Sequence, residues 1–364
     1  MHSIRTATEA PAETTADLHV TGFTTLPSPE DVAASLPLGA GRGSLVARTR
    51  DEVRAIMDGR DDRLLVIAGP CSIHDVDAGL EYAGRLVREA DRHQDDLLIV
   101  MRAYFEKPRT TVGWKGLIND PHLDGSHDIA TGLRMARGFL RDVTALGMPC
   151  GTEFLEPISP QYTADLVTWG AIGARTTESQ IHRQLASGLS MPIGFKNGTD
   201  GGLQVALDAA SAASAPQAFL CIGADGRASL VSTTGNPDTS VILRGGADGP
   251  NYGAEHVRRA SERLAAAGLT ERVIVDASHA NSGKDHLRQA EVAAELADQI
   301  STEGAAIAGV MLESNLIAGS QRLDVAVGSA GLVRGQSVTD ACMDWDATRQ
   351  AMDVLADAVR RRRG

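Results

Sequence analysis

Short runs of branched apolar residues alternate along the chain with longer stretches in which apolar positions recur at helical spacing. The short runs predict eight strands, at residues 64–68, 97–102, 149–154, 171–175, 192–196, 241–244, 273–276 and 308–313. The longer stretches predict helices at residues 78–93, 128–146, 160–169, 202–214, 254–267, 285–301 and 347–362. Strands that alternate with helices in this way predict an α/β fold, a closed (β/α)8 TIM barrel of parallel strands. A doubly wound open sheet is the second possibility, but no GxGxxG turn follows the first strand.

Two segments depart from this alternation. Residues 1–60 contain prolines and a glycine-rich stretch at 39–43, and they predict an N-terminal extension with a poorly ordered tip, an arm and a first helix at 44–58. Residues 61–364 would then form the catalytic barrel. Two further strand-like runs, 218–222 and 229–233, flank a turn signal and predict a β-hairpin inserted at about 217–234. We expect such an insertion to serve assembly or regulation.

Composition and charge argue against some kinds of binding partner and cellular location. The 364 residues are 43% hydrophobic, which is sufficient for a full core, and the net charge of −12 argues against nucleic acid or an anionic membrane surface as a partner. No apolar run reaches the length of about 18–20 residues that a membrane span needs. The N-terminus lacks the apolar core of a secretory signal, and the four cysteines are widely spaced without a CxxC pair. We therefore expect a reducing, cytoplasmic setting.

Cations gather at the predicted strand ends. The stretch 101–120 leaves a buried strand and is bent by proline and glycine, so its basic residues can form an oxyanion cradle rather than a helix. A solvated basic loop is the alternative. In a (β/α)8 barrel the strand ends meet at one mouth, and five cations would converge there: Arg102, Lys107, Arg175, Lys196 and Arg244. Because like charges repel strongly in a pocket of low dielectric constant, the site predicts a highly anionic ligand such as a phosphorylated carboxylate.

A second group of strand-end residues offers metal-ligand chemistry. Cys71, His279 and Glu313, with a further acid downstream, supply a thiolate, an imidazole and a carboxylate from different strands. Spacing alone leaves two other readings open. Cys71 and His279 could be ordinary core residues, or they could form a nucleophilic Cys/His pair.

Seven segments carry a resemblance to a known family. They are residues 68–75, 101–120, 170–180, 192–200, 242–246, 278–282 and 309–314. In these segments the chain resembles the type I (microbial) 3-deoxy-D-arabino-heptulosonate 7-phosphate (DAHP) synthases, and the similarity runs from about residue 44 to the C-terminus. The resemblance implies condensation of phosphoenolpyruvate with erythrose 4-phosphate, the first step of the shikimate pathway. It also implies a divalent metal ion, which could be Mn²⁺, Fe²⁺, Co²⁺ or Zn²⁺.

The resemblance assigns roles to individual residues. The metal ligands would be Cys71, His279, Glu313 and Asp340. The phosphoenolpyruvate site would comprise Arg102, Lys107, Arg175, Lys196 and Arg244, and Ala174 would be a further substrate-binding residue. The erythrose 4-phosphate site would comprise Lys107, Pro108, Arg109, Thr110 and Thr111. Lys107 is the candidate proton donor, with a pKa that its cationic neighbours should lower, and Glu153 is the candidate residue near the attacking water.

Regulation and assembly are the less defined implications. In regulated relatives the arm and hairpin help to form an inhibitor pocket for an aromatic amino acid, and the corresponding positions here are Glu156, Pro157, Gln161, Leu185, Ser190, Phe219, Cys221 and Val231. Pro157 and Cys221 are unusual for such a pocket, so feedback control stays open, as does a role in primary or secondary metabolism. A homodimer or homotetramer is expected. A related synthase for another phosphosugar, such as arabinose 5-phosphate, and a catalytically inactive regulatory barrel are the competing functions.

Overall fold

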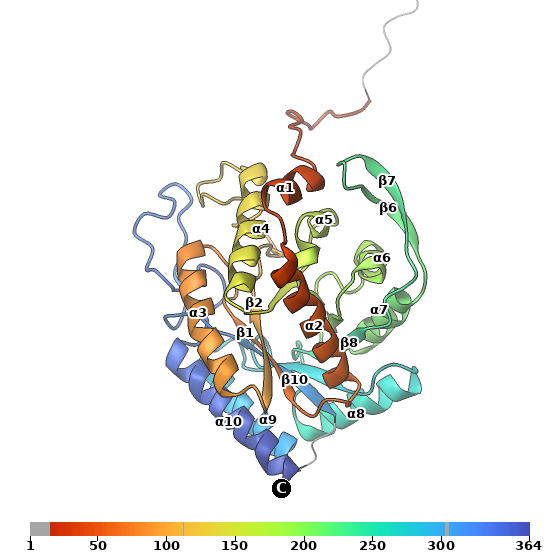
Figure 1. Cartoon of the computed structure of the whole chain (residues 1–364), viewed down its shortest axis with the longest axis vertical. Coiled ribbons are helices and arrows are strands. Elements are labelled where there is room, and N and C mark those ends of the chain that lie inside the picture. Colours follow the sequence, from red (N-terminus) through yellow and green to blue (C-terminus); the bar gives the residue numbers. More distant parts are fainter. Residues whose placement is uncertain (1–14, 112, 303–305) are drawn as a thin grey trace, which may run out of the picture.

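The chain folds into a closed barrel of eight parallel strands (Figure 1). The structure is a computed structural model, and it describes residues 15–111, 113–302 and 306–364. The barrel strands are β1 (Leu64–Gly69), β2 (Leu97–Arg102), β3 (Cys150–Glu153), β4 (Trp169–Ile172), β5 (Ile193–Lys196), β8 (Thr239–Leu243), β9 (Val273–Asp276) and β10 (Ile307–Glu313). Because β1 pairs with both β2 and β10, the sheet has no free edge. The predicted (β/α)8 barrel is confirmed.

Helices surround this barrel. They are α2 (Ala40–Met57), α3 (Val76–Arg92), α4 (Ile129–Ala145), α5 (Pro160–Thr163), α6 (Gln180–Gly188), α7 (Gln204–Ser214), α8 (Ala254–Ala266), α9 (Arg288–Thr302) and α10 (Trp345–Arg363). Aspartates begin three of the long ones, since Asp75, Asp128 and Asp344 each accept a hydrogen bond from a backbone N–H of the first turn. No helix among the described residues has the length and apolarity to cross a bilayer.

Two helices differ from the prediction. The predicted helix 160–169 is only the short α5, continued by the 3-10 turn η1 (Ala164–Leu166), because Trp169 belongs to β4 and is fully buried inside the barrel. The nine-residue helix α6 was not predicted. Its apolar positions are few, and its C-terminal Gly188 resembles a loop signal.

The interior of the barrel is a packed core that leaves one end open. Trp169 fills the centre together with apolar side chains of β1, β2, β8 and β10, and Val53, Ile56 and Met57 of α2 join the same cluster. A larger apolar layer lies between the strands and the surrounding helices. Because α2 packs against the side where the strands begin, the carboxyl ends of the strands form the accessible mouth.

The predicted hairpin is confirmed as an antiparallel pair outside the barrel, β6 (Ala218–Ile222) and β7 (Ala228–Ser232). The arm adds a short helix, α1 (Pro29–Ser35), which begins at Ser28 and lies beside the hairpin (Figure 1). The backbone N–H of Glu30 donates to the Ala224 carbonyl over 2.9 Å. The expected poorly ordered tip falls largely on residues 1–14, which lie outside the described part of the chain.

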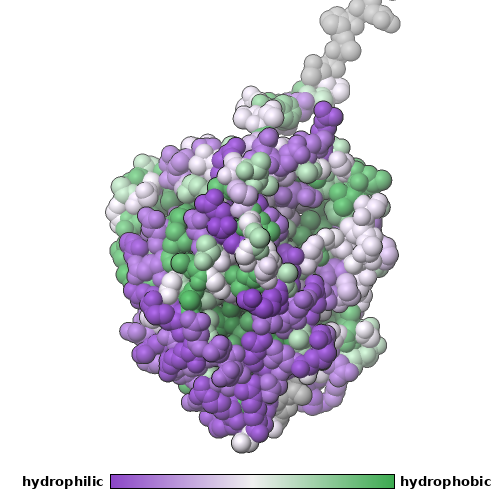
Figure 2. Space-filling view, in the orientation of Figure 1, coloured by the Kyte–Doolittle hydropathy of each residue, from purple (hydrophilic) through white to green (hydrophobic). Residues whose placement is uncertain are grey.

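Figure 2 shows hydrophilic side chains gathered at the end of the molecule where α10 terminates. The arginines there are paired with acids: Arg360 and Arg363 contact Asp96, and Arg363 also contacts Asp62. Two arginines of this basic end of α10 are therefore paired with acids of the protein itself.

Candidate active site

A cavity of about 800 Å³ lies at the carboxyl ends of the barrel strands. It brings together most of the predicted site residues, namely Lys107, Pro108, Arg109, Thr110, Thr111, Glu153, Ala174, Arg175, Lys196, Arg244, His279, Glu313 and Asp340. Of the residues predicted to bind metal or substrate or to act in catalysis, Cys71 and Arg102 do not line it, and both are fully buried.

Arg102 is held by the protein itself. Its Nη2 donates to Glu313 Oε1 over 2.9 Å, and its Nη1 lies 2.8 Å from the Met311 sulfur. The guanidinium carbon stands 3.9 Å from the centre of the Tyr104 ring, a cation–π distance. The predicted contact of Arg102 with phosphoenolpyruvate stays a prediction, since in this structure the residue first neutralises Glu313.

The Lys107 side chain contacts Cys71, one of the predicted metal ligands. Its ammonium donates to the Cys71 carbonyl over 2.9 Å and lies 3.1 Å from the Cys71 sulfur. Burial alone would lower the pKa of Lys107, but the Cys71 sulfur and the carboxylates of Glu313 and Glu153 outweigh it, so the pKa is raised. The prediction of a lowered pKa was wrong, because acidic groups surround this lysine more closely than cations do.

Cys71, Glu313 and Asp340 form a compact donor group. Their sulfur and carboxylate ligand atoms all lie within 4.8 Å of one another. Burial, with Glu313 adding to it, raises the pKa of the Cys71 thiol, so a bound metal would have to displace its proton. A sulfur with two carboxylates, and an imidazole at hand, suits Mn²⁺, Fe²⁺, Co²⁺ or Zn²⁺.

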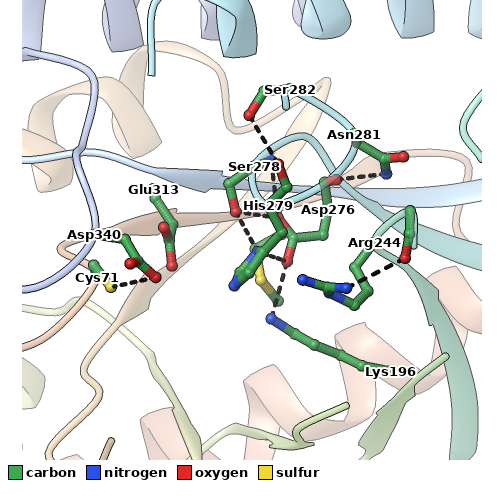
Figure 3. A network of polar contacts seen from close by, with 12 residues as sticks. Cys71, Lys196, Arg244, Asp276, Ser278, His279, Asn281, Ser282, Glu313 and Asp340 are labelled. Carbon is green, nitrogen blue, oxygen red and sulfur yellow. Dashed lines mark hydrogen bonds and ion pairs between the residues drawn. The ribbon is translucent and has the colours of Figure 1, made fainter. Parts of the chain in front are cut away.

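His279, the fourth predicted ligand, stands beside this group rather than within it. Its Nδ1 lies 2.9 Å from Asp276 Oδ2 and 2.7 Å from Ser278 Oγ. When Nδ1–H donates to the carboxylate, Nε2 keeps its lone pair, which is the form that binds a metal. Figure 3 shows Cys71, Glu313 and Asp340 on one side of His279, and Lys196 and Arg244 on the other.

Asp276 is the central acid that the sequence reasoning did not assign. It is fully buried, and its Oδ2 accepts a hydrogen bond from Lys196 Nζ over 2.9 Å, while its Oδ1 accepts from the Ser278 hydroxyl over 2.6 Å. Burial would raise its pKa, but Lys196 and His279 hold the pKa well below its usual range. Its place as the last residue of a strand, three positions before His279, was the signal that could have identified it.

Three contacts fix the conformation of the loop after β2. Lys107 N–H donates to the Lys115 carbonyl over 2.8 Å, and Gly116 has φ +114°, where an added Cβ would stand 2.0 Å from the Phe105 carbonyl oxygen. Only glycine fits this crossing. Arg175 Nη1 donates to the Pro108 carbonyl over 3.1 Å and so ties the β4 end to this loop. Val112 of the same loop lies outside the described residues.

A second cluster with metal-ligand residues lies between α3 and α10. It consists of Glu89, His93 and Asp353. A guanidinium nitrogen of Arg92 lies 3.2 Å from Glu89 and 2.9 Å from Asp353, so an arginine already bridges the two carboxylates. We interpret this cluster as an ion-pair network that joins the two helices.

Three of the residues predicted for an inhibitor pocket lie together beside the hairpin. Cys221 Sγ lies 3.5 Å from the Pro157 carbonyl oxygen, and Gln161 Nε2 lies 3.9 Å from Cys221 Sγ. Ser190 and Val231 instead line a separate cavity of about 450 Å³ at the base of the hairpin. The inhibitor pocket therefore stays a prediction.

Comparison with known proteins gives consistent matches over nearly the whole chain. A sequence model described as the DAHP synthetase I family matches residues 42–353. The phospho-2-dehydro-3-deoxyheptonate aldolase of Corynebacterium glutamicum is 56% identical over 356 residues, which cover 97% of this chain and 96% of that protein. The Phe-sensitive phospho-2-dehydro-3-deoxyheptonate aldolase of Escherichia coli K12 is 51% identical over 348 residues, with 96% and 98% covered. The solved structure of the aldolase of that name from Francisella tularensis SCHU S4 superimposes with a TM-score of 0.92 at 49% identity, covering 95% of this chain and all of that one.

Proposed function

The chain belongs to the DAHP synthetase I family, and on that premise we propose how the residues of its cavity divide the reaction. Family membership gives the activity, 3-deoxy-7-phosphoheptulonate synthase, the enzyme of the first step of the shikimate pathway. It also gives the substrates, phosphoenolpyruvate and erythrose 4-phosphate, and it implies a divalent metal ion. The proposals concern which side chains bind each of these.

Arg175, Lys196 and Arg244 bind the carboxylate and phosphate of phosphoenolpyruvate, with Arg102 and Ala174 completing the site. All except Arg102 line the cavity. Arginine suits this role because its planar fork matches both anionic groups. Holding the anion before the reaction removes much of the entropy cost of orientation.

The phosphate of erythrose 4-phosphate binds to Arg109 and Thr110, flanked by Pro108 and Thr111. Arg109, Thr110 and Thr111 are exposed, Pro108 is half-buried, and all four line the cavity. The Arg175–Pro108 hydrogen bond supports the assignment, because it places this loop beside the phosphoenolpyruvate cations. An intact set of these residues also favours erythrose 4-phosphate over a longer phosphosugar.

Cys71, His279, Glu313 and Asp340 hold the divalent metal, which when bound would polarise the aldehyde carbonyl as a Lewis acid. Lys107 donates a proton to the aldehyde oxygen, and its ammonium lies 3.1 Å from the sulfur of the proposed metal ligand Cys71. Glu153 orients the water that adds to the carbon derived from phosphoenolpyruvate. Gly173 makes room for it, since an added Cβ there would stand 2.2 Å from Glu153 Oε1.

The observation that carries these assignments is that Glu313 and Asp340, which share a donor group with the buried Cys71, line one cavity with Lys107, Lys196 and Arg244. The test is consumption of phosphoenolpyruvate with erythrose 4-phosphate, with arabinose 5-phosphate and with neither, each before and after chelation. We expect consumption with erythrose 4-phosphate and metal. Preference for arabinose 5-phosphate would favour the related synthase, and no consumption under any condition would favour an inactive regulatory barrel.

The remaining proposals concern assembly, location and regulation. A homodimer or homotetramer is supported by large apolar side chains that are exposed on the arm and hairpin, where Phe23, Leu220 and Leu230 are 84%, 86% and 71% exposed. A reducing, cytoplasmic setting is supported by four buried cysteines without a disulfide among the described residues. Activity measured with each aromatic amino acid in turn tests feedback control, and inhibition by one of them would support the pocket around Cys221.

A further inference from the structure

Three asparagines surround the turn that carries Arg244, and the reaction proposed above leaves them without a role. They are Asn197 after β5, Asn251 in the loop after β8, and Asn281 after β9. Asn197 and Asn281 are fully buried, and Asn251 is partly buried. Figure 3 shows Asn281 and Arg244 on neighbouring strand ends, with Lys196 below.

Asn197 uses its whole hydrogen-bonding capacity at this turn. Its Oδ1 accepts from Arg244 N–H over 2.8 Å and from Asn251 Nδ2 over 3.1 Å. Its Nδ2 donates to the carbonyls of Gly198, over 2.9 Å, and Gly245, over 3.0 Å. An amide has two donors and two acceptor positions, and all four are filled here. The side chain therefore binds the backbone before and after the Arg244–Gly245 peptide bond, at the N–H of Arg244 and the carbonyl of Gly245.

Asn251 and Asn281 extend the same network to the third strand end. Asn251 Oδ1 accepts from Gly245 N–H over 2.7 Å, and Asn251 N–H donates to Asn281 Oδ1 over 2.8 Å. Asn281 Nδ2 then donates to the carbonyls of Leu243, over 3.1 Å, and Asp276, over 2.8 Å. The three amides thus join the ends of β5, β8 and β9, which carry Lys196, Arg244 and Asp276.

The turn has little room to move without them. Gly245 has φ +71°, and a Cβ at Gly246 would stand 2.1 Å from Gly201 N. The backbone therefore packs against the β5 loop on one side, while the asparagines fix it on the other. A change of the backbone conformation at Arg244 and Gly245 would leave several buried polar groups without partners, which is costly.

We propose that Asn197, together with Asn251, is a positioning residue that fixes Arg244 at a set distance from Lys196, so that both cations meet one molecule of phosphoenolpyruvate. The inference rests on the proposed role of Arg244 in binding this substrate. It predicts that loss of the network weakens phosphoenolpyruvate binding selectively, and that the loss acts through Arg244.

The first test is Asn197→Asp. The substitution preserves the acceptor facing Arg244 but turns a carboxylate oxygen toward the carbonyls of Gly198 and Gly245. We expect the KM for phosphoenolpyruvate to rise by about tenfold or more, and the KM for erythrose 4-phosphate to change by less than about twofold. The matched control is Asn236→Asp. Asn236 is also buried, and its Nδ2 faces the carbonyls of Ala186, Leu189 and Met191, but it lies before β8, away from the mouth.

A comparable loss of Tm in the two variants, with a changed KM in Asn197→Asp alone, would support positioning. Equal KM values in both would overturn it. Because the new carboxylate could also act by its charge, or could prevent folding, the second test is the neutral Asn251→Ala at a partly buried position. It should raise the KM for phosphoenolpyruvate in the wild-type background but hardly at all when Arg244 is already Gln.

The double-variant cycle tests the role of Arg244 and the positioning role of the asparagines separately. If Arg244→Gln leaves the KM for phosphoenolpyruvate unchanged, the role of Arg244 fails and the inference fails with it. If Arg244→Gln raises this KM and Asn251→Ala raises it by the same factor in both backgrounds, the role of Arg244 stands and the positioning role is overturned.

Discussion

Replacement of Asp276 by Asn tests the centre of the site most directly. The carboxylate is fully buried and serves Lys196, Ser278 and His279 at once. Asparagine has the same shape, but it removes the charge and offers one oxygen and one NH2 group in place of two acceptors. The carboxylate also accepts a hydrogen bond from Ser278 N–H, so it accepts four in all, and at least one of these four donors would then face the NH2 group.

The size of the effect follows from the burial of the pair. Removing one partner of a buried ion pair costs about 3–5 kcal/mol, because the remaining charge is left without compensation. Here Lys196 is 3% exposed, so little water is at hand to compensate its charge. Loss of the hydrogen bond that orients a metal-binding imidazole lowers metal affinity by about 10–100-fold. We therefore expect both weaker stability and weaker metal binding.

The assay is thermal unfolding of the metal-free and metal-loaded protein, with metal affinity measured by competition against a chelator. Asp96→Asn is the control, since Asp96 is also a buried acid that two arginines contact, at the other end of the barrel. It should lose stability without losing metal affinity. Unchanged metal affinity in Asp276→Asn would refute the reasoning that Asp276 orients His279.

The remaining predictions concern other titratable groups and the metal. Burial raises the pKa of Glu106 to about 7, despite hydrogen bonds from Ser159 and Glu156 N–H. Its contribution to stability is thus present at low pH and lost as pH rises through about 7. The unfolding free energy of the wild type relative to Glu106→Gln should fall by about 3 kcal/mol between pH 4 and 8 in chemical denaturation, and a constant difference would contradict this. Lys107→Met should reduce kcat by about 10²-fold or more, and undiminished turnover would exclude its proton-donor role. Exhaustive chelation should abolish activity, and metal re-addition in weak buffer should release a proton from the wild type but less from Cys71→Ser.

The sequence predicted the barrel because eight buried strands recur at regular intervals, and such a pattern has few topological solutions. The prediction was wrong locally, where one residue could belong either to a helix or to the strand that follows it. Trp169 was counted as the end of a helix, yet its size suits the centre of the barrel, where it packs with Ile242 and Met311. Only the closed structure shows that this space exists.

For the site, too, the sequence predicts which residues meet but not how they pair. Strand-end positions were enough to collect the cavity residues, because parallel strands end at one mouth. Which charges pair across that mouth depends on the register between strands that are far apart in sequence. Neither the Arg102–Glu313 pair nor the acids around Lys107 could therefore be predicted, and the expected pKa shift of Lys107 had the wrong sign.

Because of these ion pairs, the five converging cations are not equivalent. Arg102 and Lys196 are neutralised by Glu313 and Asp276, whereas no described carboxylate lies within ion-pairing distance of Arg175 or Arg244. Burial and the nearby Arg175 lower the pKa of Arg244 against the effect of Asp276, so an added anion would stabilise the charge of this guanidinium. Glu313 is also a proposed metal ligand, and a carboxylate shared with a cation holds Arg102 less strongly. Metal and phosphoenolpyruvate binding should therefore reinforce each other, and by linkage each must raise the affinity of the other by the same factor.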